Sequence, residues 1–202
     1  MSIYSKKEQE ISHEIDCFSM LLIRLIVVPF FRGSKPSLVL VVIAASITGW
    51  VGWGEYQWQT NQTIGSDVVK MVSANKEGVL RCQTLSGAFF DPAVSTKGFV
   101  SSAEENVARV KYDTCQDLFS WLKSDKKTAS LKQIQALGVL THEAVHVSGE
   151  YNEAITECIS MSKLEKVAET LGANKKLSAE ISATYREEIH VRTPPQYQNG
   201  VC

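Results

Sequence analysis

The feature that most constrains this chain is the motif H-E-x-x-H, in which His142 and His146 lie four residues apart and Glu143 follows the first histidine. Residues at this spacing project from the same face of an α-helix. Two imidazoles so placed can hold one Zn²⁺ ion while the intervening glutamate handles a proton. We therefore expect a helix here, with His142 and His146 as metal ligands and Glu143 as a general base.

An acidic segment follows the motif and offers three candidates for a third ligand: Glu150, Glu153 and Glu157. At about 100° per residue, Glu157 lies roughly 40° from Glu153 around a helix, whereas Cys158 lies about 140° away. Glu153 and Glu157 can therefore face a metal together while Cys158 points elsewhere. The link between the two helices, residues 148–151, is short, so it must fold the second helix back sharply for Glu153 to reach the metal.

Residues 152–157, with the sequence N-E-A-I-T-E, resemble the N-E-x-x-x-[D/E] segment of the thermolysin-like (gluzincin) metallopeptidases. The resemblance implies that Glu153 ligates zinc and that Glu157 supports the first histidine from behind. Those enzymes place a much longer connection between this segment and H-E-x-x-H. Residues 79–202 also resemble small secreted or membrane-anchored bacterial proteins that share H-E-A-x-H-x-x-G, E-A-x-x-E-C, a helix with a tyrosine (here Tyr185) and a terminal cysteine. The second resemblance implies a metallopeptidase and names no substrate.

The motif and its resemblances predict zinc-dependent hydrolysis of peptide bonds. The two histidines and Glu153 leave a fourth metal position for water, whose pKa zinc lowers. Glu143 accepts the proton of that water and delivers it to the leaving amine. We expect a further donor to stabilise the oxyanion, with Tyr185 and His190 on the last helix as candidates. The rival hypothesis is a degenerate zincin-like binding or assembly module of the cell envelope, with a structural metal or none.

The N-terminal quarter is far more apolar than the rest, and residues 38–53 carry no charge. A helix needs about 20 residues to cross a bilayer, and extension through Trp58 meets that length. Amphipathic aromatic residues gather at its end, and basic residues precede it, as in a span whose N-terminus is cytoplasmic. We therefore expect residues 37–58 to be a single-pass transmembrane signal anchor in the cell membrane; the alternative is a buried core helix.

The segments on either side of this anchor follow from its orientation. Residues 1–36 are expected to be cytoplasmic or interfacial, and the apolar stretch 17–31, interrupted by Arg24, is read as interfacial or as the first span of a hairpin. Residues 59–202 are expected to form an extracytoplasmic domain. A net charge of −1 gives no electrostatic footprint for nucleic acid, so the expected partners are the membrane and a peptide or protein of the envelope. The oligomeric state is not indicated.

Four cysteines follow the apolar stretch: Cys82, Cys115, Cys158 and Cys202. An even number in an oxidising compartment predicts two disulfides, and four free thiols are the alternative. Three pairings are possible and the sequence does not choose among them; we favour Cys82–Cys115 with Cys158–Cys202.

The outer domain is expected to be α+β and zincin-like, with a short β-sheet and three to four C-terminal helices. Hydrophobic periodicity and turn residues place these elements. The expected strands are 79–85, 98–101 and 107–112. The expected helices are a short one within 60–77 after a polar connector, then 115–123, 130–147, 152–171 and 177–189, followed by an irregular tail.

Overall fold

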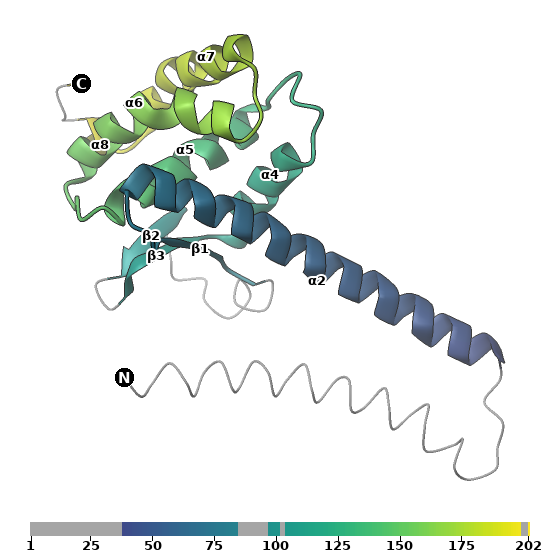
Figure 1. The fold of residues 1–202 in the computed structure, drawn as a ribbon. Helices are drawn as coiled ribbons and strands as arrows, with labels where there is room; N and C mark the ends of the chain where they lie inside the picture. Colours follow the sequence, from purple (N-terminus) through teal and green to yellow (C-terminus); the bar gives the residue numbers. More distant parts are fainter. Residues whose placement is uncertain (1–37, 85–96, 102–103, 199–201) are drawn as a thin grey trace. The chain divides into compact units, whose positions relative to one another are not determined.

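The computed structural model describes residues 38–84, 97–101, 104–198 and 202 (Figure 1). The chain divides into two compact units, Met1–Tyr56 and Gln57–Cys202. The expected N-terminal segment 1–36, with its interfacial stretch 17–31, lies outside the described residues. Within the described residues the architecture is α+β, with helices around a small three-stranded sheet.

The expected transmembrane anchor over residues 37–58 is wrong. Among the helices that the structure describes, none combines the length and the apolar character that crossing a bilayer requires. The apolar stretch belongs to helix α2, which runs without a break from Leu38 to Ser73. After Trp53 this helix continues through polar residues, so the apolar part is only its first half. The expected polar connector before a separate short helix is likewise absent from this part of the chain.

Trp58 belongs to the folded unit rather than to a membrane interface. Its ring stacks on Tyr112 with centroids 5.3 Å apart, and it meets Phe119 edge-on at 4.8 Å. Beginning ten residues further on (68 − 58), the same helix buries three valines in the core, at positions 68, 69 and 72. The second half of α2 is therefore a core helix of the unit Gln57–Cys202, because its apolar residues recur on one side at helical spacing.

The sheet has the order β1-β3-β2, with bounds Val79–Cys82 (β1), Gly98–Ser101 (β2) and Glu104–Val110 (β3). Strand β1 pairs with β3 in parallel, whereas β2 pairs with β3 antiparallel and forms one edge. The bounds of β2 are those expected from the sequence. The third expected strand, 107–112, begins earlier in the structure, and the turn residues expected between β1 and β2 lie outside the described residues.

The sheet is followed along the chain by α4 (Tyr112–Leu122), α5 (Leu131–His146), α6 (Glu153–Thr170) and α7 (Lys175–Thr184). Helix α5 begins with a capping box, in which the hydroxyl of Ser130 accepts from the backbone of Gln133 and the side chain of Gln133 bonds back. The helix expected over 177–189 is not uniform. After Thr184 it widens into a π-helical turn, η1 (Tyr185–Ile189), followed by a 3-10 turn, η2 (His190–Arg192), and the short helix α8 (Pro195–Gln198).

Two disulfides close the unit, and they confirm the favoured pairing. Cys82 at the end of β1 is bonded to Cys115 on α4, with Cα atoms 6.0 Å apart. Cys158 on α6 is bonded to Cys202, with Cα atoms 5.3 Å apart. Paired cysteines are typical of proteins that fold in an oxidising compartment.

Candidate metal centre

The last turns of α5 carry the H-E-x-x-H motif into the interior. His142, Glu143 and His146 are 7%, 4% and 8% exposed. Alanine and valine side chains between and beside them are buried in the core, so the helix is fixed on both flanks of the motif. This burial distinguishes the three residues from surface histidines with an ordinary glutamate, because charged side chains are rarely buried without a partner.

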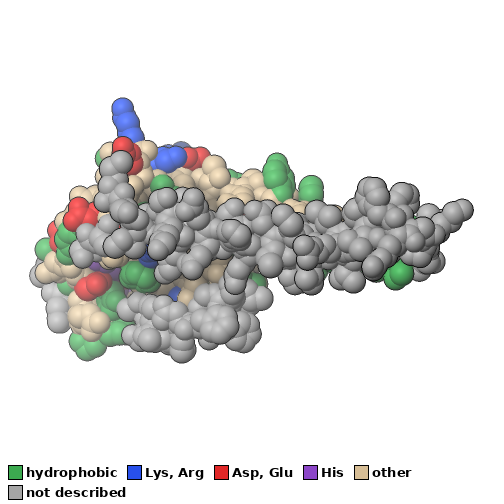
Figure 2. Space-filling model, turned by 90° about the horizontal axis from the view of Figure 1, so that it is seen from below, with side chains coloured by type: hydrophobic (Ala, Val, Ile, Leu, Met, Phe, Trp, Pro, Cys, Tyr) green, Lys and Arg blue, Asp and Glu red, His purple; other side chains and the backbone are tan. Residues whose placement is uncertain are grey.

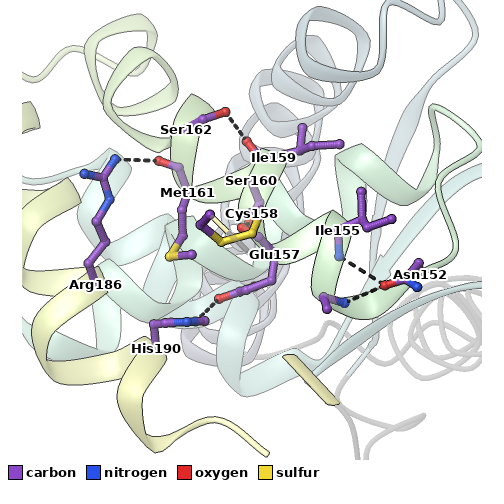
Figure 3. The surroundings of a disulfide bond; sticks show 12 residues. Asn152, Ile155, Glu157, Cys158, Ile159, Ser160, Met161, Ser162, Arg186 and His190 are labelled. Carbon is purple, nitrogen blue, oxygen red and sulfur yellow. Dashed lines mark hydrogen bonds and ion pairs between the residues drawn. A yellow bond between two sulfur atoms is a disulfide. The ribbon is translucent and has the colours of Figure 1, made fainter. Parts of the chain in front are cut away.

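The short link between α5 and α6 turns on a glycine. Gly149 has a φ of +96°, the left-handed conformation that glycine adopts without strain, and its N–H donates to the carbonyl of His146 at 2.9 Å. The side chain of Asn152 then accepts from the backbone N–H groups of Ala154 and Ile155, both at 3.1 Å (Figure 3). This cap starts α6 at Glu153, so the link does bring the first carboxylate of α6 back to α5.

Three donor atoms converge where α5 and α6 meet. Glu153 Oε2 lies 3.0 Å from His142 Nε2 and 3.4 Å from His146 Nε2. Ligand atoms of the three residues all lie within 4.8 Å of one another. This is the set expected from the sequence, with Glu153 as the third member. Of the other candidates, Glu150 contributes its backbone carbonyl and Glu157 lies behind His142.

The outer nitrogens of both histidines are engaged with acceptors. His146 Nδ1 lies 2.6 Å from the carbonyl oxygen of Glu150, and His142 Nδ1 lies 2.9 Å from Glu157 Oε2. A carbonyl and a carboxylate only accept, so each Nδ1 carries the hydrogen and each neutral ring presents the lone pair of Nε2 to the centre. Two lone pairs then face the carboxylate of Glu153. Such a cluster needs a cation between its members, either a proton or a metal ion.

The pKa shifts of the site residues in the absence of a metal ion also indicate that a positive charge is needed between the donor atoms. Burial lowers the pKa of His142, but hydrogen bonds with Glu153 and Glu157 and the charge of Glu143 outweigh it and raise the pKa to about 9. The hydrogen bond with His142 holds the pKa of Glu153 below its usual value. Without a metal, a proton on His142 therefore supplies the positive charge, and a metal ion would replace it.

Glu157 is the hub behind His142. The residue is 2% exposed, and Oε1 accepts from the hydroxyl of Tyr185 at 3.0 Å. The same oxygen lies 3.1 Å from His190 Nδ1 (Figure 3). Burial opposes its ionisation, but the hydrogen bond with His142 and its other partners hold its pKa below the usual value. Tyr185 and His190, expected as donors to an oxyanion, thus both engage Glu157. Burial and the charge of Glu157 raise the pKa of Tyr185 well above 10.

Glu143 lies beside the cluster without joining it. Burial raises its pKa to about 8, the charge of His142 opposes the rise and that of Glu153 adds to it. Its Oε2 is buried and has no hydrogen-bond partner among the described residues. A Cβ on Gly98, at the start of edge strand β2, would come within 2.6 Å of Glu143 Oε1. Glycine at this position therefore leaves room for the carboxylate under the edge of the sheet.

A cavity of about 590 Å³ opens next to Glu143, between α5, the start of β2 and the segment that follows α7. His142 and Glu143 form part of its wall, and Tyr197 of α8 forms another part, with its ring centroid 5.5 Å from that of His142. Burial raises the pKa of Tyr197, and the charges of Glu153, Glu143 and Glu157 raise it further. On the face drawn in Figure 2, histidine is visible at the surface beside acidic and hydrophobic side chains.

Three contributors to the site were not expected from the sequence. Tyr197 lies in the tail that we expected to be irregular, and Gly98 acts only through the space that it leaves. Thr156, which is fully buried, places its hydroxyl 3.5 Å from His146 Nδ1 and donates to the carbonyl of Glu150 at 3.3 Å. The sequence signal for Thr156 was its position directly before Glu157 on α6. The first of these two residues lies beside His146 and the second beside His142.

A scan against protein-family models and searches of curated proteins and of solved structures found no match to this chain. The resemblance to thermolysin-like peptidases therefore stays a prediction. The function proposed below rests on the side-chain geometry of the site.

Proposed function

We propose that this protein is a zinc-dependent peptidase, with zinc held by His142, His146 and Glu153. The observation that supports the proposal best is the junction of α5 and α6, where two imidazole Nε2 atoms and one carboxylate oxygen lie within 4.8 Å of one another. Imidazole and carboxylate are the ligands of catalytic zinc sites, which keep one position open. Zinc bound there would acidify water and polarise a substrate carbonyl.

Glu143 is suited to the role of general base. It is buried, its Oε2 has no hydrogen-bond partner in the described part of the chain, and it lines the cavity. A carboxylate that already accepts protein hydrogen bonds would have to give them up to take a proton, whereas this one does not. Burial raises its pKa to about 8, so its carboxylate is a stronger base than that of an exposed glutamate. A purely structural metal site needs no such group.

Tyr185 and His190 support the site through Glu157 and are not assigned a direct contact with the substrate. Both act on Glu157, which in turn fixes the ring of His142 with its Nε2 facing the donor cluster. Carboxylate–histidine pairs of this kind orient ligands and raise their basicity. We therefore assign Glu157 as the partner of the first ligand, and Tyr185 and His190 as residues that hold Glu157.

A peptide is the substrate that the cavity fits best. Strand β2 forms an edge of the described sheet and begins beside Glu143, so its backbone can pair with an extended chain. The cavity wall combines apolar side chains with polar ones, and its volume of about 590 Å³ accommodates a few residues. The two disulfides further support action outside the cytoplasm.

The proposal is tested with Glu143→Gln, which keeps the shape of the side chain and removes the base. We expect wild-type protein to carry about one zinc per chain by metal analysis and to cleave casein. The variant should keep its zinc and lose activity by about 100-fold or more. Glu165→Gln, an exposed position on α6, is the matched control and should behave as wild type. Equal cleavage by Glu143→Gln contradicts the peptidase; zinc binding without any cleavage points to the degenerate binding or assembly module instead.

A further inference from the structure

The chain returns to the site after η2, and two interactions hold it there. At the last residue of α8, the side-chain amide of Gln198 donates to the carbonyls of His190, Val191 and Thr193, at 3.3, 3.1 and 2.7 Å. Beyond α8, Cys202 is bonded to Cys158. Helix α8, which ends at Gln198, lies against α6.

The cysteine of α6 that bonds Cys202 is next to a residue of the site in the sequence. Cys158 follows Glu157 directly, and Figure 3 shows the two side chains leaving α6 in different directions, with Glu157 toward His190 and Cys158 in the disulfide. The same turn of α6 therefore supports His142 through Glu157 and holds Cys202 through the disulfide. A bond at this turn restrains the terminal segment relative to the metal ligands themselves.

Tyr197 is the residue that this segment presents to the site. Its ring lies 5.5 Å from that of His142, tilted by 56°, and it forms part of the cavity wall together with Glu143. The charges of Glu153, Glu143 and Glu157 all act on its phenol. The hydroxyl of Tyr185, in contrast, is buried and committed to Glu157. Tyr197 also lines the cavity; its hydroxyl accepts from the side chain of Gln196, which leaves its own hydrogen for another acceptor.

We infer that the Cys158–Cys202 disulfide positions Tyr197 over the candidate metal site, and that the Tyr197 hydroxyl donates a hydrogen bond to the substrate there. Only the second statement, the hydrogen bond from Tyr197 to the substrate, rests on the proposed peptidase function. Three residues separate Gln198 from Cys202, so the disulfide closes a short tether and narrows the conformations open to α8. A positioned donor that acts on developing negative charge contributes about 10²–10³-fold to kcat.

The positioning is tested without turnover, by nitration of tyrosines with tetranitromethane and mass spectrometry. The comparison is between wild-type protein and the Cys158→Ser/Cys202→Ser variant, with Tyr151, which is 54% exposed, as the internal reference. We expect nitration of Tyr197 relative to Tyr151 to rise several-fold when the tether is removed. An unchanged ratio in a folded variant overturns the positioning role.

The role on the substrate is tested by a double-mutant cycle on peptide cleavage. Tyr197→Phe should lower kcat by about 10²-fold and leave the zinc content unchanged, whereas Tyr112→Phe, on α4, serves as the matched control. In the variant without the tether, adding Tyr197→Phe should have little further effect, because the hydroxyl has already left its place. Additive losses, or full activity of Tyr197→Phe, overturn this half of the inference.

The two tests separate the inference from the proposed function. If wild-type protein binds zinc and cleaves peptide, but the nitration ratio does not change and Tyr197→Phe is fully active, the peptidase proposal stands and the inference is refuted. A protein that cleaves no peptide refutes the peptidase and the donor role together, and the nitration ratio then decides the positioning by itself.

Discussion

Replacement of Glu157 by glutamine gives a sharp test of how the site is built. The carboxylate has two oxygens and three partners: Oε2 meets His142 Nδ1 at 2.9 Å, and Oε1 meets the Tyr185 hydroxyl and His190 Nδ1. Glutamine has almost the same shape but offers one acceptor and one NH₂ group. With its oxygen toward Tyr185, the NH₂ group faces His142 and requires Nδ1 to accept, which moves the ring hydrogen to Nε2 and blocks it as a ligand. With its oxygen toward His142, the bond from Tyr185 is lost.

Either orientation weakens zinc binding. Loss of such a supporting partner costs 10–100-fold in metal affinity, or about 1.4–2.7 kcal/mol. The assay is competition for zinc against a chromophoric chelator at neutral pH, with folding checked by circular dichroism. Glu165→Gln on the same helix is the control for charge and should keep wild-type affinity. A zinc affinity of Glu157→Gln within about twofold of wild type would refute the reasoning, because it would mean that the tautomer of His142 does not depend on Glu157.

Three further predictions concern the pH dependence of stability, the space beside Glu143 and the Cys82–Cys115 disulfide. The pKa of His142 is raised from 6.5 to about 9 and that of Glu143 from 4.5 to about 8, so the folded metal-free protein holds protons that the unfolded chain has lost. Its urea midpoint should fall between pH 6.5 and 9, and saturating zinc should flatten the curve; a rise over this range contradicts the assignment. Gly98→Ala should displace Glu143 and lower peptide cleavage by about 10-fold or more while the zinc content stays constant, as measured by kinetics and metal analysis. Removal of the Cys82–Cys115 disulfide, which spans 33 residues, should cost about 3–4 kcal/mol of unfolding free energy in denaturant titration, and an unchanged midpoint would contradict it.

Local signals in the sequence predicted the parts of the site that local chemistry determines. The capping role of Asn152, the glycine stop at position 149 and the helical spacing of the two histidines all act within a few residues. They predicted the two helices and made Glu153 one of three candidates for the third ligand; the packing of α6 on α5 brings Glu153 to the histidines. The angle between Glu153 and Cys158 around α6 likewise anticipated that one faces the cluster and the other the disulfide.

Long-range packing decided the parts that the sequence did not predict. The apolar stretch at the start of α2 matched a membrane span in composition, but the helix continues, and Trp58 packs on Tyr112 and Phe119, which lie 54 and 61 residues later (112 − 58 and 119 − 58). The parallel pairing of β1 with β3 has no local signature either. Tyr197 reaches the site because α8 packs back on α6 and the Cys158–Cys202 disulfide joins the tail to that helix, so its place depends on contacts far away in the sequence.

The tight turn at Gly149 has a consequence for how the protein folds. His142 and Glu153 are only 11 residues apart in the chain, so the loop that brings them together is short and costs little entropy to close. The α5–α6 hairpin is therefore a low-contact-order element that can form before the sheet, whose parallel strands pair over longer separations. We expect zinc to bind this hairpin early, so that the metal accelerates folding as well as slowing unfolding.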